Sequence, residues 1–100
     1  MKKLTLEQVL KALVDNQSVE IENGYVEYYL HINENGEIVT SFRDAEISFT
    51  HKVDTDEIDG WDEADDMDVI YNQENMETPW FADAVQDLTE QANEWIEENE

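Results

Sequence analysis

The stretch "TPWFADAVQDLTEQANEWIEEN", residues 78–99, decides the fold of this chain. Threonine is a preferred N-cap residue and proline fits the first helical position, so Thr78 and Pro79 predict the start of a helix. Apolar residues then recur at the three- and four-residue steps of an amphipathic helix. This core stripe consists of Phe81, Ala84, Val85, Leu88, Ala92, Trp95 and Ile96. We therefore expect a long C-terminal helix with one buried face.

The opposite face of this helix is acidic. Its carboxylates recur at steps of four, three, four and three residues, at Asp83, Asp87, Glu90, Glu94 and Glu97. At a rise of 1.5 Å per residue, the row places one charge every ~5 Å along ~21 Å.

The whole chain is acidic, with 27 acids, five Lys and Arg residues and a formal net charge of −22. Residues 51–100 hold eighteen of the acids and one base, Lys52. Solvated faces usually mix both signs, and a one-signed surface costs stability through self-repulsion. The absence of Lys and Arg after Lys52 therefore indicates a role beyond solubility.

A second helix is predicted from about Leu6 to Val14 or Asp15. Thr5 and Gln8 have the spacing of a capping box, and Leu4 and Val9 that of a hydrophobic staple. The expected apolar stripe contains Leu6, Val9, Leu10, Leu13 and Val14.

Alternating strands lie between the helices. Asn23-Gly24 indicates a two-residue hairpin that sets Ile21 opposite Val26 and Val19 opposite Tyr28. A three-residue loop at 34–36, with Gly36 left-handed in a bulge, sets Ile32 opposite Ile38 and Tyr28 opposite Phe42. Apolar residues alternate again at Ala45, Ile47, Phe49 and Val53.

These elements predict one α+β domain spanning residues 1–100. It has an N-terminal helix, a three- to four-stranded antiparallel sheet (meander) and a long C-terminal helix packed on the sheet. Residues 54–77 allow a short helix or a short strand, and the pattern does not decide between them.

Residues 54–68, "DTDEIDGWDEADDMD", contain nine acids among fifteen residues. With Gly60 at the glycine position of a calcium-binding EF-hand loop, Thr55 occupies the first ligand position and Asp66 the last, where Asp and Glu are needed. We therefore expect no specific metal site, and no motif implies a cofactor.

No enzyme motif is present. His31 and His51 belong to no metal-binding or catalytic pattern, and we expect structural roles for both. The serines lie in strands without a nucleophile-elbow motif. No cysteine is available for disulfides or thiolate metal sites. The sequence therefore predicts a protein that is not an enzyme.

The charge excludes direct nucleic-acid binding, which needs Lys and Arg against phosphates. It also opposes binding to anionic membranes, and no apolar run is long enough to span one. Rigid rows of carboxylates instead approximate the phosphate backbone. The expected partner is a basic nucleic-acid-binding protein, such as a nuclease or another DNA-processing enzyme. We expect this chain to act in the cytoplasm, as a monomer or a homodimer. The partner-binding residues would be the five acids of the C-terminal helix together with Asp54, Asp56, Glu57, Asp59, Trp61, Asp62, Glu63, Asp65, Asp66 and Asp68.

In size, charge and α+β pattern the chain resembles the small acidic anti-defence proteins of phages and mobile elements. These include anti-restriction DNA mimics, uracil-DNA glycosylase inhibitors and anti-CRISPR proteins. The resemblance is one of type, without a shared motif: the Glu-Ser-Ile strand motif of the glycosylase inhibitors is missing. It implies an inhibitor that occupies the DNA-binding cleft of a host enzyme. The alternative is an acidic interaction module that uses Tyr25 and Tyr29 on the second sheet face to regulate a repair, transcription or toxin protein.

Overall fold

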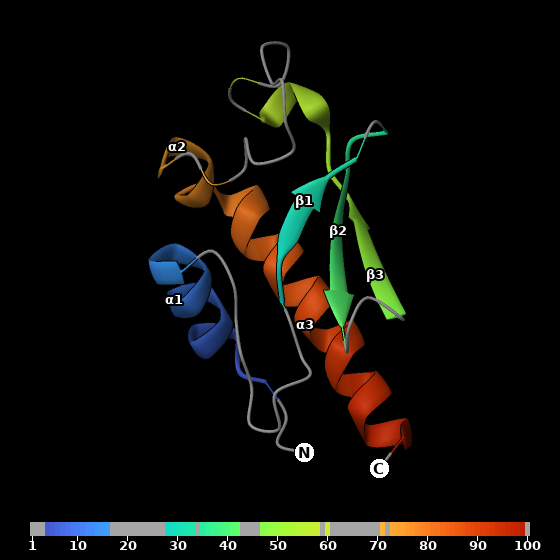
Figure 1. The fold of residues 1–100 in the computed structure, drawn as a ribbon. Helices are drawn as coiled ribbons and strands as arrows, with labels where there is room; N and C mark the ends of the chain where they lie inside the picture. Colours follow the sequence, from blue (N-terminus) through green and yellow to red (C-terminus); the bar gives the residue numbers. More distant parts are fainter. Residues whose placement is uncertain are drawn as a thin grey trace.

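The computed structural model describes residues 4–16, 28–33, 35–42, 47–58, 60, 71 and 73–99. Figure 1 shows helix α1 on one side of the long helix α3 and the sheet on the other. The elements in chain order are α1 Leu6–Asn16, β1 Leu30–Ile32, β2 Glu37–Phe42, β3 Ile47–Lys52, the 3-10 helix η1 Thr55–Glu57, α2 Gln73–Met76 and α3 Pro79–Asn99. The predicted α+β architecture is confirmed, with three antiparallel strands in the order β1-β2-β3 among the described residues.

Helix α3 begins at Pro79, as the sequence predicts. The Thr78 side-chain oxygen accepts a hydrogen bond from the Phe81 backbone N–H at 3.4 Å, so Thr78 is the N-cap. The same hydroxyl donates to the Asn75 carbonyl at 2.6 Å. This bond ties the short helix α2 to the start of α3.

Helix α1 is capped by Thr5, whose side-chain oxygen accepts from the Gln8 N–H at 3.2 Å. Both backbone groups of Leu4 are held by Asn93 of α3: the Leu4 N–H donates to Asn93 Oδ1 at 2.8 Å, and Asn93 Nδ2 donates to the Leu4 carbonyl at 2.9 Å. This clamp fixes the entry to α1 against α3.

The prediction that Val14 belongs to the apolar stripe that α1 buries is wrong, because this residue is 53% exposed. Val9 and Leu13 are fully buried, whereas Leu6 and Leu10 are partly buried. Consecutive residues of a helix point about 100° apart. Val14 therefore lies outside the face that α3 covers.

The predicted register of β1 and β2 is confirmed, with Ile32 opposite Ile38. Gly36 has a positive φ of 75°, which matches the left-handed position expected in the turn. Asn33 Oδ1 accepts hydrogen bonds from the N–H groups of Asn35 at 2.9 Å and Glu37 at 3.0 Å. This side chain fixes the turn and thereby the register.

The predicted alternation of the last strand is also confirmed. Ile47, Phe49 and His51 are half-buried on the face toward α3, whereas the residues between them are exposed. The pairing expected between Tyr28 and Phe42 is not part of the described ladder, since β1 begins at Leu30. The Asn23-Gly24 hairpin, its pairs Ile21–Val26 and Val19–Tyr28, the fourth strand and Ala45 lie outside the described residues.

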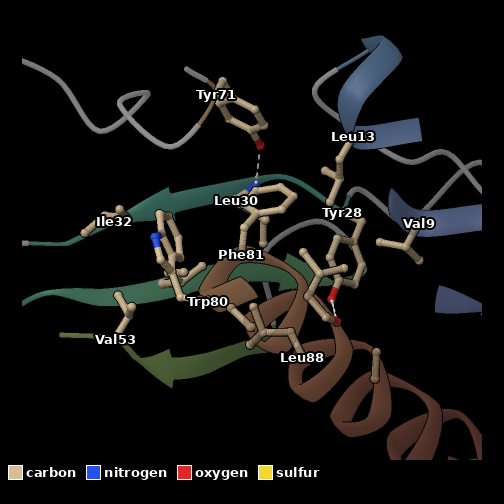
Figure 2. Packing of buried hydrophobic residues seen from close by; sticks show 14 of the residues in the cluster. Val9, Leu13, Tyr28, Leu30, Ile32, Val53, Tyr71, Trp80, Phe81 and Leu88 are labelled. Atoms are coloured by element: carbon tan, nitrogen blue, oxygen red, sulfur yellow. Dashed lines mark hydrogen bonds between the residues drawn. The ribbon is translucent and has the colours of Figure 1, made fainter. Parts of the chain in front are cut away.

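The core lies between α3, α1 and the inner face of the sheet (Figure 2). Tyr28 is fully buried, and its hydroxyl lies 3.3 Å from the Val85 carbonyl and 3.0 Å from Thr89 Oγ1. Burial raises the pKa of the Tyr28 phenol far above its ordinary value, so this group stays neutral. The Tyr71 hydroxyl accepts from the buried Leu30 N–H at 2.9 Å. Two tyrosines thus supply hydrogen bonds inside the core.

Removing these two hydroxyls should have unequal effects on stability. Tyr71→Phe leaves the buried Leu30 N–H without its partner, which costs about 1–3 kcal/mol. Tyr28→Phe leaves the helical Val85 carbonyl and the Thr89 hydroxyl free to bond each other, so we expect a loss of about 1 kcal/mol. Urea unfolding of both variants measures the difference. An equal or smaller loss for Tyr71→Phe contradicts the assigned role of its hydroxyl.

Candidate interaction surface

The predicted acidic row is present on the outer face of α3. Asp83, Glu90, Glu94 and Glu97 are exposed, and the Asp87 side chain is 47% exposed. The opposite face of α3 is buried, and Phe81, Ala84 and Leu88 on it are fully enclosed. The row therefore faces outward. The packing that holds the helix therefore also fixes the direction of its carboxylates.

Neutral amides take the place of bases along this row. Gln86 Nε2 donates to Glu90 Oε1 at 3.4 Å, and Gln91 Nε2 donates to Asp87 Oδ2 at 3.1 Å. Both are i,i+4 pairs on the helix surface. They orient carboxylates without adding a positive charge to the row.

A side-chain pair joins the row to the sheet. His51 Nδ1 of β3 lies 2.9 Å from Asp87 Oδ2, the oxygen that Gln91 also contacts. The alternation of β3 predicts that His51 faces α3, but it does not show which α3 residue meets it. Asp87 is therefore both a member of the acidic row and a link between α3 and β3.

The acidic row has an energetic cost. Glu90 and Glu94, and Glu94 and Glu98, are like-charged i,i+4 pairs, each destabilising by roughly 0.2–0.5 kcal/mol. Acids at a helix C-terminus also oppose the helix dipole, and the last turn of α3 contains no base. Folding alone does not favour this arrangement.

Of the nine acids in residues 54–68, the structure describes Asp54, Asp56 and Glu57, all exposed. Asp54 Oδ1 accepts from the Asp56 N–H at 3.0 Å, and the Asp54 carbonyl accepts from the Glu57 N–H at 3.0 Å. Ile58 is buried and anchors the segment to the core. Figure 1 shows η1 beyond the end of β3, at the end of the molecule where α3 begins.

The other residues proposed from this run lie outside the described residues: Asp59, Trp61, Asp62, Glu63, Asp65, Asp66 and Asp68. Trp80, in the first turn of α3, is buried in the core. Its Nε1 has no hydrogen-bond partner among the described residues. Trp80 therefore belongs to the core and not to an exposed contact surface.

His31 and Tyr29 lie on the second face of the sheet. Tyr29 is 39% exposed, and its ring centroid lies 6.4 Å from that of His31 and 5.9 Å from that of Tyr71. Tyr25, expected on the same face, lies outside the described residues.

No group of three or more potential metal ligands occurs within the described part of the chain. The described helices also include none that is long and apolar enough to cross a membrane. Comparison with known proteins gives no match to a protein-family model, a curated protein or a solved structure.

Neutralising one row residue should stabilise the protein. Glu94→Gln removes the like-charge i,i+4 pairs with Glu90 and Glu98 near the negative end of the α3 dipole, so we expect a gain of roughly 0.5 kcal/mol at low salt. The gain should vanish at high salt because screening weakens both effects. Thermal unfolding at two salt concentrations measures it.

Glu7→Gln is the matched control, since Glu7 is an exposed acid in the first turn of α1, where a negative charge is favourable. This variant should lose stability at low salt. A loss of stability in Glu94→Gln would contradict the electrostatic cost assigned to the row.

Proposed function

We propose that this protein is a non-enzymatic inhibitor that acts as a DNA mimic in the cytoplasm of a host cell. It would occupy the DNA-binding cleft of a host defence nuclease, either a CRISPR-Cas effector or a restriction enzyme. The observation that carries the proposal is the outward-facing acidic row of α3, Asp83 to Glu97, in a chain without Lys or Arg after Lys52.

The spacing of the row supports mimicry. Its five carboxylates extend over ~21 Å, at one charge per ~5 Å of helix axis. One DNA strand presents a phosphate every ~3.4 Å. The row is therefore somewhat sparser than a phosphate backbone, but it has the same sign and a length of about six phosphate steps.

The rigid helix that carries the row is a second argument for DNA mimicry. A partner that binds a flexible acidic segment must also order it, which lowers the affinity. Here the row belongs to one continuous helix, Pro79–Asn99, whose inner face is part of the core. The carboxylates are thus held in place before the partner arrives.

The charge of the surface favours a basic cleft. Long-range attraction speeds association with such a cleft, while nucleic acids and anionic membranes are repelled. Asp54, Asp56 and Glu57 add three exposed acids in and next to η1. Inhibition by occupancy needs no catalytic group, which agrees with the absence of an enzyme motif from the sequence.

A second candidate is an acidic interaction module that regulates another nucleic-acid-binding protein through the outer sheet face. The partly exposed Tyr29 beside His31 favours it, because tyrosine is enriched at interface hot spots. Tyr29→Ala would abolish binding in this case, whereas a DNA mimic would tolerate the change.

Inhibition of DNA cleavage tests the proposal directly. The protein is added to a Cas9-type nuclease and to restriction endonucleases, and cleavage is measured at increasing DNA and salt concentrations. Inhibition of at least one enzyme should be competitive with DNA. Affinity should fall at least about tenfold between ~50 and ~200 mM salt. Inhibition that persists at saturating DNA, or that salt leaves unchanged, contradicts mimicry.

A charge-matched pair of variants locates the surface. Glu90→Lys combined with Glu94→Lys should abolish inhibition, because both residues are exposed in the row. Glu7→Lys combined with Asp15→Lys makes the same change in net charge on α1 and should preserve most of the inhibition. Equal effects of the two pairs would show that net charge, and not the α3 row, determines binding. Circular dichroism verifies that each variant is folded.

A further inference from the structure

The two edges of the sheet differ in accessibility. The Val53 N–H donates to the Gly36 carbonyl at 3.2 Å, which marks a hydrogen-bonded pair of β3 with the chain before β2. In an antiparallel ladder such pairs alternate with non-hydrogen-bonded pairs. The backbone groups of Ser48, Thr50 and Lys52 therefore point away from β2. We call these groups the outer edge of β3.

The described sheet adds no strand at the outer edge of β3. Ser48, Thr50 and Lys52 are all exposed, and no strand of the described sheet lies beyond β3. One backbone group of this edge is contacted by α3: the Thr50 carbonyl accepts from Gln91 Nε2 at 3.4 Å. The edge of β1 is different, because Leu30 is buried and its outward N–H is held by the Tyr71 hydroxyl.

An exposed strand edge is a template for pairing with another chain. Pairing with a second copy of this protein would bring together two chains of net charge −22, which repel each other. The same charge attracts a basic segment. From this geometry we infer that the outer edge of β3 accepts an extended basic segment of the partner protein as an added strand.

The position of Asp87 indicates where the basic residues of that segment would lie. His51 Nδ1 contacts Asp87 Oδ2 at 2.9 Å, so this member of the acidic row lies next to β3 on the inner side of the sheet. Side chains of a strand alternate between the two faces, so those on one face recur every ~6.8 Å. Arg or Lys at every second position would face Asp87 and its neighbours. The side chains between them would lie on the face of the exposed Lys52, where a cation is disfavoured.

Backbone hydrogen bonds would thus supply affinity, and the charge alternation would supply specificity. The inference rests on the proposed function in one respect, namely that the partner is a basic protein. That β3 is an edge strand of the described sheet follows from the strand order, and the direction of its backbone groups follows from the ladder.

Amide hydrogen exchange with a short synthetic peptide of alternating threonine and arginine tests the inference. In the free protein the N–H groups of Thr50 and Lys52 should exchange fast, whereas those of Phe49 and His51 should be protected by β2. The peptide should slow exchange at Thr50 and Lys52. A Thr50 amide that is already protected in the free protein, or no binding of the peptide, overturns the inference. The same peptide with N-methylated backbone amides should not bind.

Two variants separate the strand edge from the acidic row. Thr50→Pro removes an outward N–H while keeping the β2–β3 hydrogen bonds, because an edge strand tolerates proline on its outer side. It should lower the peptide affinity about tenfold, whereas Thr50→Val should not. Unchanged protection of Phe49 and His51 verifies the fold. Equal peptide affinity of Thr50→Pro and Thr50→Val overturns the inference.

Glu90→Gln combined with Glu94→Gln should also weaken peptide binding. If this pair has no effect while Thr50→Pro abolishes binding, the edge inference stands and the electrostatic basis of the proposed function fails. If the pair abolishes binding while Thr50→Pro has no effect, the acidic row stands and the edge inference fails.

Discussion

The buried face of α3 is the constraint on which the rest of the structure depends. The sheet packs against one side of this face and α1 against another, and Phe81, Val85 and Leu88 are fully enclosed between them. Because only one side of the helix is needed for packing, the other side is free to carry charge. The fold thus separates the residues that hold α3 in place from those that face solvent.

This separation explains how so acidic a chain can keep an ordered core. The apolar stripe of α3 and the inner face of the sheet bury their side chains together, and the two buried tyrosines Tyr28 and Tyr71 have their hydroxyls bonded. Repulsion among the surface acids lowers the net stability, but the acids lie outside the packing. The surface acids therefore account for the electrostatic cost and the buried apolar residues for the hydrophobic stabilisation. Substitutions in one set can leave the contribution of the other set unchanged.

Features set by neighbouring residues could be predicted from the sequence. The caps at Thr5 and Thr78, the turn at Gly36 and the acidic face of α3 all depend on spacings of a few residues. The exposure of Val14 could not be predicted, because the width of the buried face of α1 depends on how α3 packs against it. The His51–Asp87 pair and the bond from Leu30 to Tyr71 join residues distant in the sequence, and no local pattern indicates them. Between residues 54 and 77 the many acids leave no regular spacing of apolar residues. The short helices η1 and α2 therefore could not be predicted from the sequence.

The clamp between Asn93 and Leu4 has a consequence for how the protein is made. It joins residues 89 positions apart, and α3, the main partner of α1, is at the other end of the described chain. During synthesis the apolar stripe of α1 therefore remains without its partner until residue 93 has left the ribosome, several seconds later at roughly 5–20 residues per second. Until then the nascent chain exposes that stripe while its acidic segments repel one another. The closing of the two ends is thus a late, cooperative step, and the carboxylate row takes its fixed direction only at that moment.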